Sequence, residues 1–165
     1  MRQSIILKLF IFYLLVSVFF YSCRKDKGID PDLAFKDFAL FDSCVKTDGI
    51  KFYKNSPQTI YSGNNGPHGA FKLKFNSIAN NALTDNGKLP VGGKFPENSM
   101  VIKEVIKDGS VSLYAIMYKR KGAWLWAEYG ADSKVLFSVN NDPSVCINCH
   151  NQTGNRDLVT SFIFY

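Results

Sequence analysis

The sequence lacks the marks of several broad classes of protein. No run of five or more basic residues occurs, and the net charge is +6 over 165 residues. Without Arg2 and Lys8 the chain keeps 20 − 2 = 18 basic residues against 14 acidic ones, an excess that is spread along the chain. This balance is typical of a solvated surface and excludes a nucleic-acid-binding protein. No internal repeat or low-complexity segment appears, and an aromatic content of 15% excludes a disordered chain.

The chain also lacks a hydrophobic run long enough for a typical membrane span. The apolar run at residues 9–20 follows two basic residues and ends before a basic stretch, which indicates an export signal over residues 1–22. The junction resembles a bacterial lipobox, so we expect Cys23 to be the lipidated first residue of the mature protein. Ordinary secretion and an uncleaved signal anchor are the alternatives. Arg24, where an aspartate would retain the protein in the inner membrane, favours the outer membrane of the cell envelope.

Residues 23–31 are charged and contain Gly28 and Pro31, so they predict a tether before a single domain over residues 32–165. The patterns in this domain predict a mainly β (α+β) fold, an antiparallel sheet with one or two short helices and a C-terminal haem-binding loop. Asp108-Gly109 predicts a tight hairpin turn. We expect helices from Asp30-Pro31 to about residue 41 and over residues 77–83, and strands at residues 50–53, 71–75, 100–107, 111–119, 123–129, 135–139 and 159–165.

Cysteine and histidine are scarce, with four and two residues, yet three of these six form one motif. Cys146-Ile-Asn-Cys149-His150 has the spacing of a covalent haem c attachment site. Its two thiols can form thioethers to the vinyl groups of one porphyrin, and the adjacent imidazole of His150 can bind the iron. Export agrees with this prediction, because bacteria attach c-type haem outside the cytoplasm.

Two other uses of the motif fit less well. A closed zinc site needs four ligands, and the spare candidates are only Cys44 and His68. A disulfide between Cys146 and Cys149 would leave His150 unexplained. Cys44 is then an odd thiol, which we expect to be buried because apolar residues flank it.

The sixth iron ligand would separate an electron carrier from a reactive centre. Met100, Met117 and His68 are the candidates. Both methionines lie in strand patterns, where core packing is their ordinary role, and His68 stands in a turn. No candidate stands out, so we expect an open distal site.

The order of motifs in the second half of the chain resembles the cytochrome P-460 family, whose members include the cytochromes c′-beta. The resemblance covers residues 45–165. It implies a mainly β, dimeric, c-type haem domain with five-coordinate iron. The matching segments are residues 68–76, 95–104, 115–119, 124–126, 146–150 and 156–159.

In the enzymes of this family a lysine is cross-linked to the porphyrin, and the haem oxidises hydroxylamine. The resemblance makes Lys103 the matching lysine. Strand alternation puts Lys103 on the same face as Val101 and Val105, but the opposite face is equally apolar. Lys103 is therefore either employed in the haem pocket or exposed on the strand.

The family enzymes also carry a distal carboxylate that accepts protons. This chain has Tyr114 and Ala115 near the matching position and no acidic residue between residues 111 and 119, which argues against hydroxylamine oxidation. The resemblance to the cytochromes c′-beta makes Phe71 a candidate wall of an apolar distal pocket, with core packing as the alternative. Arg156 is a candidate partner of a haem propionate, with Asp157 or solvent as alternatives.

Together these features predict a lipid-anchored monohaem c-type cytochrome, periplasm-facing or on the cell surface, that binds a small nitrogen species such as nitric oxide. An oxidoreductase acting on hydroxylamine or nitric oxide, with Lys103 cross-linked, is the second hypothesis. A simple periplasmic electron carrier is the third. The resemblance adds a homodimer, and no feature of the sequence indicates the redox partner.

Overall fold

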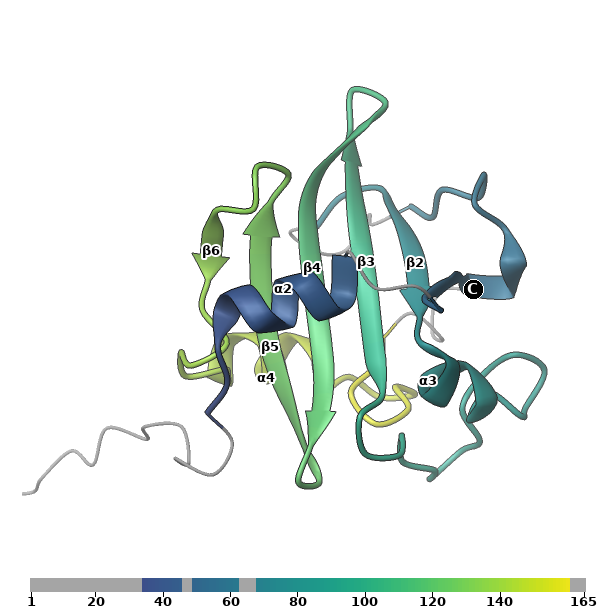
Figure 1. The fold of residues 1–165 in the computed structure, drawn as a ribbon. Helices are drawn as coiled ribbons and strands as arrows, with labels where there is room; N and C mark the ends of the chain where they lie inside the picture. Colours follow the sequence, from purple (N-terminus) through teal and green to yellow (C-terminus); the bar gives the residue numbers. More distant parts are fainter. Residues whose placement is uncertain (1–33, 46–48, 63–67, 161–165) are drawn as a thin grey trace, which may run out of the picture.

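The computed structural model describes residues 34–45, 49–62 and 68–160. The predicted signal, the tether and Cys23 lie outside these residues. Within them, six strands form one antiparallel sheet in the order β1-β2-β3-β4-β5-β6, so each strand pairs with its neighbours in sequence (Figure 1). The predicted fold, mainly antiparallel β with a few short helices, is confirmed.

The elements follow the sequence predictions closely in the centre of the sheet and less closely at its edges. The strands are β1 (Lys51–Phe52), β2 (Phe71–Phe75), β3 (Met100–Lys107), β4 (Ser110–Arg120), β5 (Ala123–Gly130) and β6 (Val135–Phe137). The helices are α2 (Asp37–Val45), α3 (Ser77–Asn81) and α4 (Ser144–His150), with a short 3₁₀ turn η1 (Tyr53–Asn55).

Two tight turns connect the three long strands. Asp108 and Gly109 have φ of 50° and 78°, and Lys121 and Gly122 have φ of 48° and 76°. Two successive positive φ values are the geometry of the turn whose twist matches that of a hairpin, and glycine adopts it at little cost. The predicted turn at Asp108-Gly109 is confirmed, and the carboxylate of Glu97 accepts hydrogen bonds from both amides of the second turn.

Side chains of the central strands alternate between two buried faces. Residues directly opposite one another on β3, β4 and β5 point the same way, because the side-chain period of a strand is two. One such row is Val101, Met117 and Trp126, and the next row, on the other face, is Ile102, Ile116 and Ala127. Both faces are therefore apolar along the middle of the sheet.

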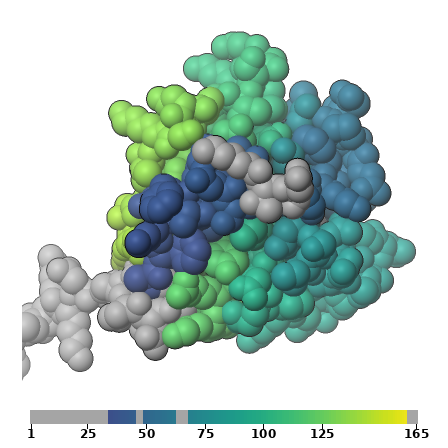
Figure 2. Space-filling view, viewed as in Figure 1, coloured from purple at the N-terminus to yellow at the C-terminus, as the bar shows by residue number. Residues whose placement is uncertain are grey.

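Helix α2 covers the second of these faces, where Figure 1 shows it crossing the strands and Figure 2 shows it seated over them. Of the predicted helix from Asp30-Pro31 to about residue 41, residues 30–33 lie outside the described residues, and residues 34–36 are not helical, since α2 begins at Asp37. The reason is Phe35, whose backbone N–H and carbonyl are both bonded to the side chain of Asn140 (3.1 and 2.7 Å). A backbone held by these bonds is not available for helical bonds.

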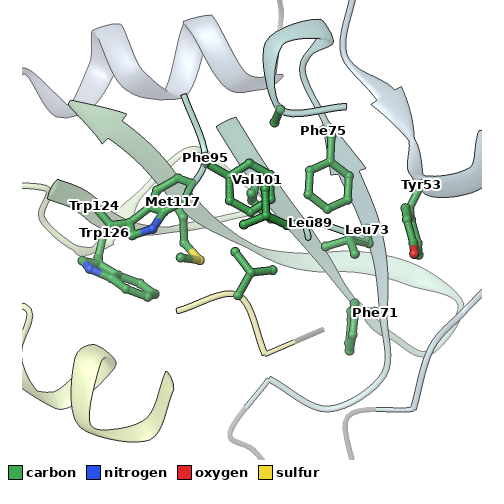
Figure 3. Packing of buried hydrophobic residues seen from close by; sticks show 12 residues of the cluster. Tyr53, Phe71, Leu73, Phe75, Leu89, Phe95, Val101, Met117, Trp124 and Trp126 are labelled. Carbon is green, nitrogen blue, oxygen red and sulfur yellow. The ribbon is translucent and has the colours of Figure 1, made fainter. Parts of the chain in front are cut away.

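The first face carries the larger aromatic cluster. Figure 3 shows Phe71 and Phe75 along β2, with Trp124 and Trp126 on the far side of the same cluster. Helix α4 and the segment after it lie behind the sheet in Figure 1, on this face. Of the predicted final strand at residues 159–165, only Val159 and Thr160 are described, and Val159 pairs with Arg156 in a turn; residues 161–165 lie outside the described residues.

In the described part of the chain, no helix has the length and apolarity to cross a membrane.

The carboxylate of Asp37 joins α2 to the segment after β6, where it accepts from Val139 N (2.8 Å) and Ser138 Oγ (2.8 Å). We expect Asp37→Asn to lower the free energy of unfolding by about 1–2 kcal/mol, because one of these partly buried donors loses its charged acceptor. Urea denaturation measures the change. Asp108→Asn in the exposed hairpin turn is the control, with an expected change below about 0.5 kcal/mol. Equal changes in the two variants would contradict the anchoring role of Asp37.

Candidate haem site

The cysteine and histidine motif forms helix α4, not the loop that the sequence predicted. The N-cap of this helix is Pro143, which has no side-chain cap, and the carboxylate of Asp142 just before it accepts from the backbone N–H of Ser144 at 3.0 Å. Cys146 and Cys149 are three residues apart, which puts them on neighbouring positions of one helix face. Both line the same cavity, together with His150.

The imidazole of His150 is held by a hydrogen bond between its Nδ1 and the carbonyl oxygen of Leu158, at 2.8 Å. A carbonyl can only accept, so Nδ1 carries the proton and Nε2 keeps its lone pair. Trp126 packs its ring against the imidazole at 4.7 Å between centroids and an angle of 76°. Burial lowers the pKa of His150 to about 4, so the ring is neutral at neutral pH. A neutral imidazole with a free Nε2 is the form that binds a metal.

The cavity beside the motif has a volume of about 980 Å³. This is at the upper end of the range of small-molecule and cofactor sites, roughly 300–1,000 Å³. Its walls come from the first face of the sheet and from α4. They include Phe71, Leu73, Val101, Ala115, Met117 and Trp126.

Lys103 lies in this cavity and not on the outer surface of the strand. Its Nζ stands 4.1 Å from the centroid of the Phe71 ring. Burial lowers the pKa of Lys103 to about 8, although the charges of Cys149 and Glu128 act in the opposite direction. Lys103 therefore faces the cavity and is not exposed on the strand, and Phe71 both lines the cavity and packs in the buried core cluster.

Glu128 is an acidic side chain in the cavity that the sequence reasoning missed. It lies on β5 directly opposite Ala115 of β4, and its Oε1 is 2.9 Å from His68 Nε2. Residues 111–119 contain no acidic residue, whereas the neighbouring strand β5 provides one. The register of β4 against β5 pairs Ala115 with Glu128, and this register follows from the hairpin turn at Gly122. Glu128 could have been predicted as a cavity residue from that turn.

The three candidates for a sixth iron ligand do not all lie on the same face of the sheet. Met100 belongs to the opposite face, where its sulfur contacts Cys44 Sγ at 3.6 Å, so its candidacy is wrong. Met117 and His68 both line the cavity. His68, however, already uses Nε2 in its contact with Glu128.

Arg156 does not join the site. Its guanidinium binds the carboxylate of Asp85 and the carbonyl oxygen of Leu89, and it is not among the residues that line the cavity. Arg156 therefore binds the loop before β3. These contacts take the place of the predicted contact with a propionate and of the alternative contacts with Asp157 or solvent.

The zinc alternative loses support. Cys44 lies on α2 and is buried against the face of the sheet opposite the motif. In the segments that the structure describes, no group of three or more histidine, cysteine, aspartate and glutamate side chains could hold a metal ion by itself. A closed zinc site needs four such ligands.

The donor set fits haem c. Two free thiols and one neutral imidazole line one cavity of suitable volume. The indole Nε1 of Trp126, a wall residue, is buried and has no hydrogen-bond partner among the described residues. A buried donor of this kind is what an acceptor group of a bound molecule would satisfy.

No family model, no curated protein and no solved structure matches this chain. The resemblance to the cytochrome P-460 family therefore stays a prediction from the sequence.

Burial raises the pKa of Cys44 to about 12. At pH 8 a thiol with this pKa is ionised in about one molecule in ten thousand, and the thiolate is the reactive form. We expect pulse alkylation of the folded, haem-free chain to label exposed Cys149 and to leave Cys44 unmodified until denaturant is added. Peptide mapping by mass spectrometry measures both sites. Labelling of Cys44 at the rate of Cys149 under native conditions would contradict its burial.

Proposed function

We propose that the chain is an exported monohaem c-type cytochrome with an open distal site for a small nitrogen species such as nitric oxide. Cys146 and Cys149 would hold haem c through thioethers, and His150 would bind the iron. One observation carries this proposal: Nδ1 of His150 is bonded to Leu158, so Nε2 is left free in a cavity that both thiols line. Haem bound there would supply an iron centre that binds small neutral gases.

The walls of the cavity support a small neutral ligand. Phe71, Val101 and Ala115 offer apolar surface, which suits a diatomic gas better than a charged substrate. Met117 is the one methionine that lines the cavity among the residues described, and its place in the core cluster favours packing over iron binding. We therefore rank the electron carrier below the gas binder.

We also propose that Cys23 anchors the protein by a lipid in the outer membrane, facing the periplasm, and that the protein is a homodimer. The lipobox-like junction supports the anchor, and the likeness to the cytochrome P-460 family supports the dimer.

A second function is favoured by Glu128 and Lys103. A carboxylate inside the cavity is a candidate proton acceptor for the oxidation of hydroxylamine or nitric oxide, and Lys103 is a candidate for the cross-link to the porphyrin. The absence of an acid from residues 111–119 no longer argues against this oxidoreductase. His68 supports it further, since its contact with Glu128 offers the proton a path onward.

The first test of the proposal is covalent haem. We expect the exported wild-type protein to keep one haem on a denaturing gel and in its intact mass, because thioethers survive denaturation. The double variant Cys146→Ser, Cys149→Ser should lose it, while Cys44→Ser, on the other face of the sheet, should keep it. A wild-type protein without covalent haem, or a double variant that retains it, would contradict the proposal.

The visible spectrum of the haem-loaded protein then separates the functions. A high-spin spectrum that shifts on addition of nitric oxide supports the gas binder. A low-spin spectrum indifferent to added ligands leaves only the electron carrier.

The oxidoreductase makes its own prediction. A red-shifted ferrous Soret band that disappears in Lys103→Ala would support the cross-link. In that case Glu128→Gln should lower the rate of hydroxylamine oxidation by about 10²–10⁴, because the amide cannot accept the proton. Haem content should not change, and Glu97→Gln at the exposed turn is the control. Equal rates in Glu128→Gln and wild type would remove Glu128 from the reaction.

A further inference from the structure

Asp157 is fixed by contacts from three separate parts of the chain. Both of its carboxylate oxygens accept from Lys119 Nζ, at 3.0 Å each, and Oδ2 also accepts from Phe95 N at 2.9 Å. Its backbone carbonyl oxygen accepts from Trp124 Nε1 at 2.8 Å. The side chain and the backbone of one residue are thus anchored to β4, to β5 and to the segment before β3.

The ion pair between Lys119 and Asp157 is buried, with side chains 4% and 10% exposed. A buried ion pair is weak evidence for stability, because desolvation costs about as much as the attraction gains. Breaking one, in contrast, is strongly unfavourable, since it leaves a buried charge without its partner. The pair is therefore better suited to fixing a position than to raising stability.

The position that it fixes is an unusual one. Asp157 and Leu158 have φ of 52° and 65°, two successive residues in the left-handed region. Residues with side chains adopt this region at a cost, and they stay there only where the surroundings hold them. The bonds to Asp157 provide this hold. Asn155 adds to it, because its side chain accepts from Leu158 N (3.2 Å) and donates to the carbonyl of His150 (2.8 Å).

Because the backbone follows this path, the Leu158 carbonyl oxygen lies within hydrogen-bond distance of His150 Nδ1. We propose that Asp157, clamped by Lys119, is a positioning residue for the iron ligand: it holds the Leu158 carbonyl where it receives the Nδ1 proton of His150. This inference rests on the proposed function. A ring that donates Nδ1–H to a carbonyl is fixed in rotation and is a stronger electron donor to a metal.

The variant that tests the clamp is Asp157→Asn, which keeps the size of the side chain but replaces one acceptor oxygen by a donor facing Lys119 or Phe95 N. The matched control is Glu104→Gln. Glu104 is also a buried carboxylate paired with a lysine, Lys74, but it lies outside the cavity, on the face beneath α2. Loss of one buried ion pair is common to both variants, so only the position of the Leu158 carbonyl distinguishes them.

In the haem-loaded protein, Asp157→Asn should move the iron–histidine stretching band of the ferrous form to lower frequency. The reduction potential should become more positive, because a weaker donor stabilises ferric iron less. Resonance Raman spectroscopy and spectroelectrochemistry measure the two, and Glu104→Gln should leave both at wild-type values. A haem-loaded Asp157→Asn protein with unchanged band and potential overturns the proposal.

A second measurement does not depend on haem. Nitrogen-15 NMR of the His150 imidazole should show a slowly exchanging Nδ1 proton in the wild type and in Glu104→Gln, and a faster one in Asp157→Asn. If the wild type carries no haem, the proposed function fails, but this exchange rate still tests the role of Asp157. Equal exchange rates in the wild type, Glu104→Gln and Asp157→Asn would overturn that role. Should Asp157→Asn not fold, Lys119→Met leaves the bond to Phe95 N intact. It should produce the same shifts, and their absence overturns the proposal.

Discussion

The alternation of side chains across β3, β4 and β5 is the constraint on which the rest of the structure depends. Because neighbouring rows point to opposite sides, a sheet with apolar residues in every row must be covered twice. Helix α2 covers one side with Leu40 and Phe41. On the other side the row of Val101, Met117 and Trp126 meets α4 and the cavity. The candidate site is thus a consequence of a sheet that is apolar on both faces.

The same alternation explains why charged groups stand inside the cavity. Lys103 and Glu128 share a face with apolar neighbours, so each loses part of its contact with water. Such desolvation is unfavourable for a charged group. Their mutual attraction and the contact of Glu128 with His68 offset part of this cost. The cavity therefore combines apolar walls with groups that can hold or move a proton. The apolar walls suit the proposed gas binder, and the proton-holding groups suit the proposed oxidoreductase.

The sequence predicted the centre of this structure better than its edges. Alternation and turn chemistry are local, so Phe71–Phe75, Met100–Lys107 and the turn at Asp108-Gly109 could be read directly. The motif could be recognised from its local spacing, and Lys103 was proposed from the resemblance to a family; the two cysteines and the histidine of the motif line one cavity with Lys103 in the structure. What escaped depends on contacts distant in sequence. Asn140 moves the start of α2, Asp85 captures Arg156, and Glu128 reaches the cavity only through the pairing of β5 with β4.

Two buried ion pairs between a lysine and a carboxylate, one on each face of the sheet, have different roles. Lys74 and Glu104 join β2 to β3 on the α2 side, across strands that the backbone ladder already holds together. Lys119 and Asp157 instead join β4 to a segment in which the only pairing described is the turn between Arg156 and Val159. Without a ladder, the course of that segment depends on side chains, and its Leu158 carbonyl meets the imidazole. Removing a pair of the first kind therefore changes stability alone, whereas the second pair also determines how His150 is presented to the cavity.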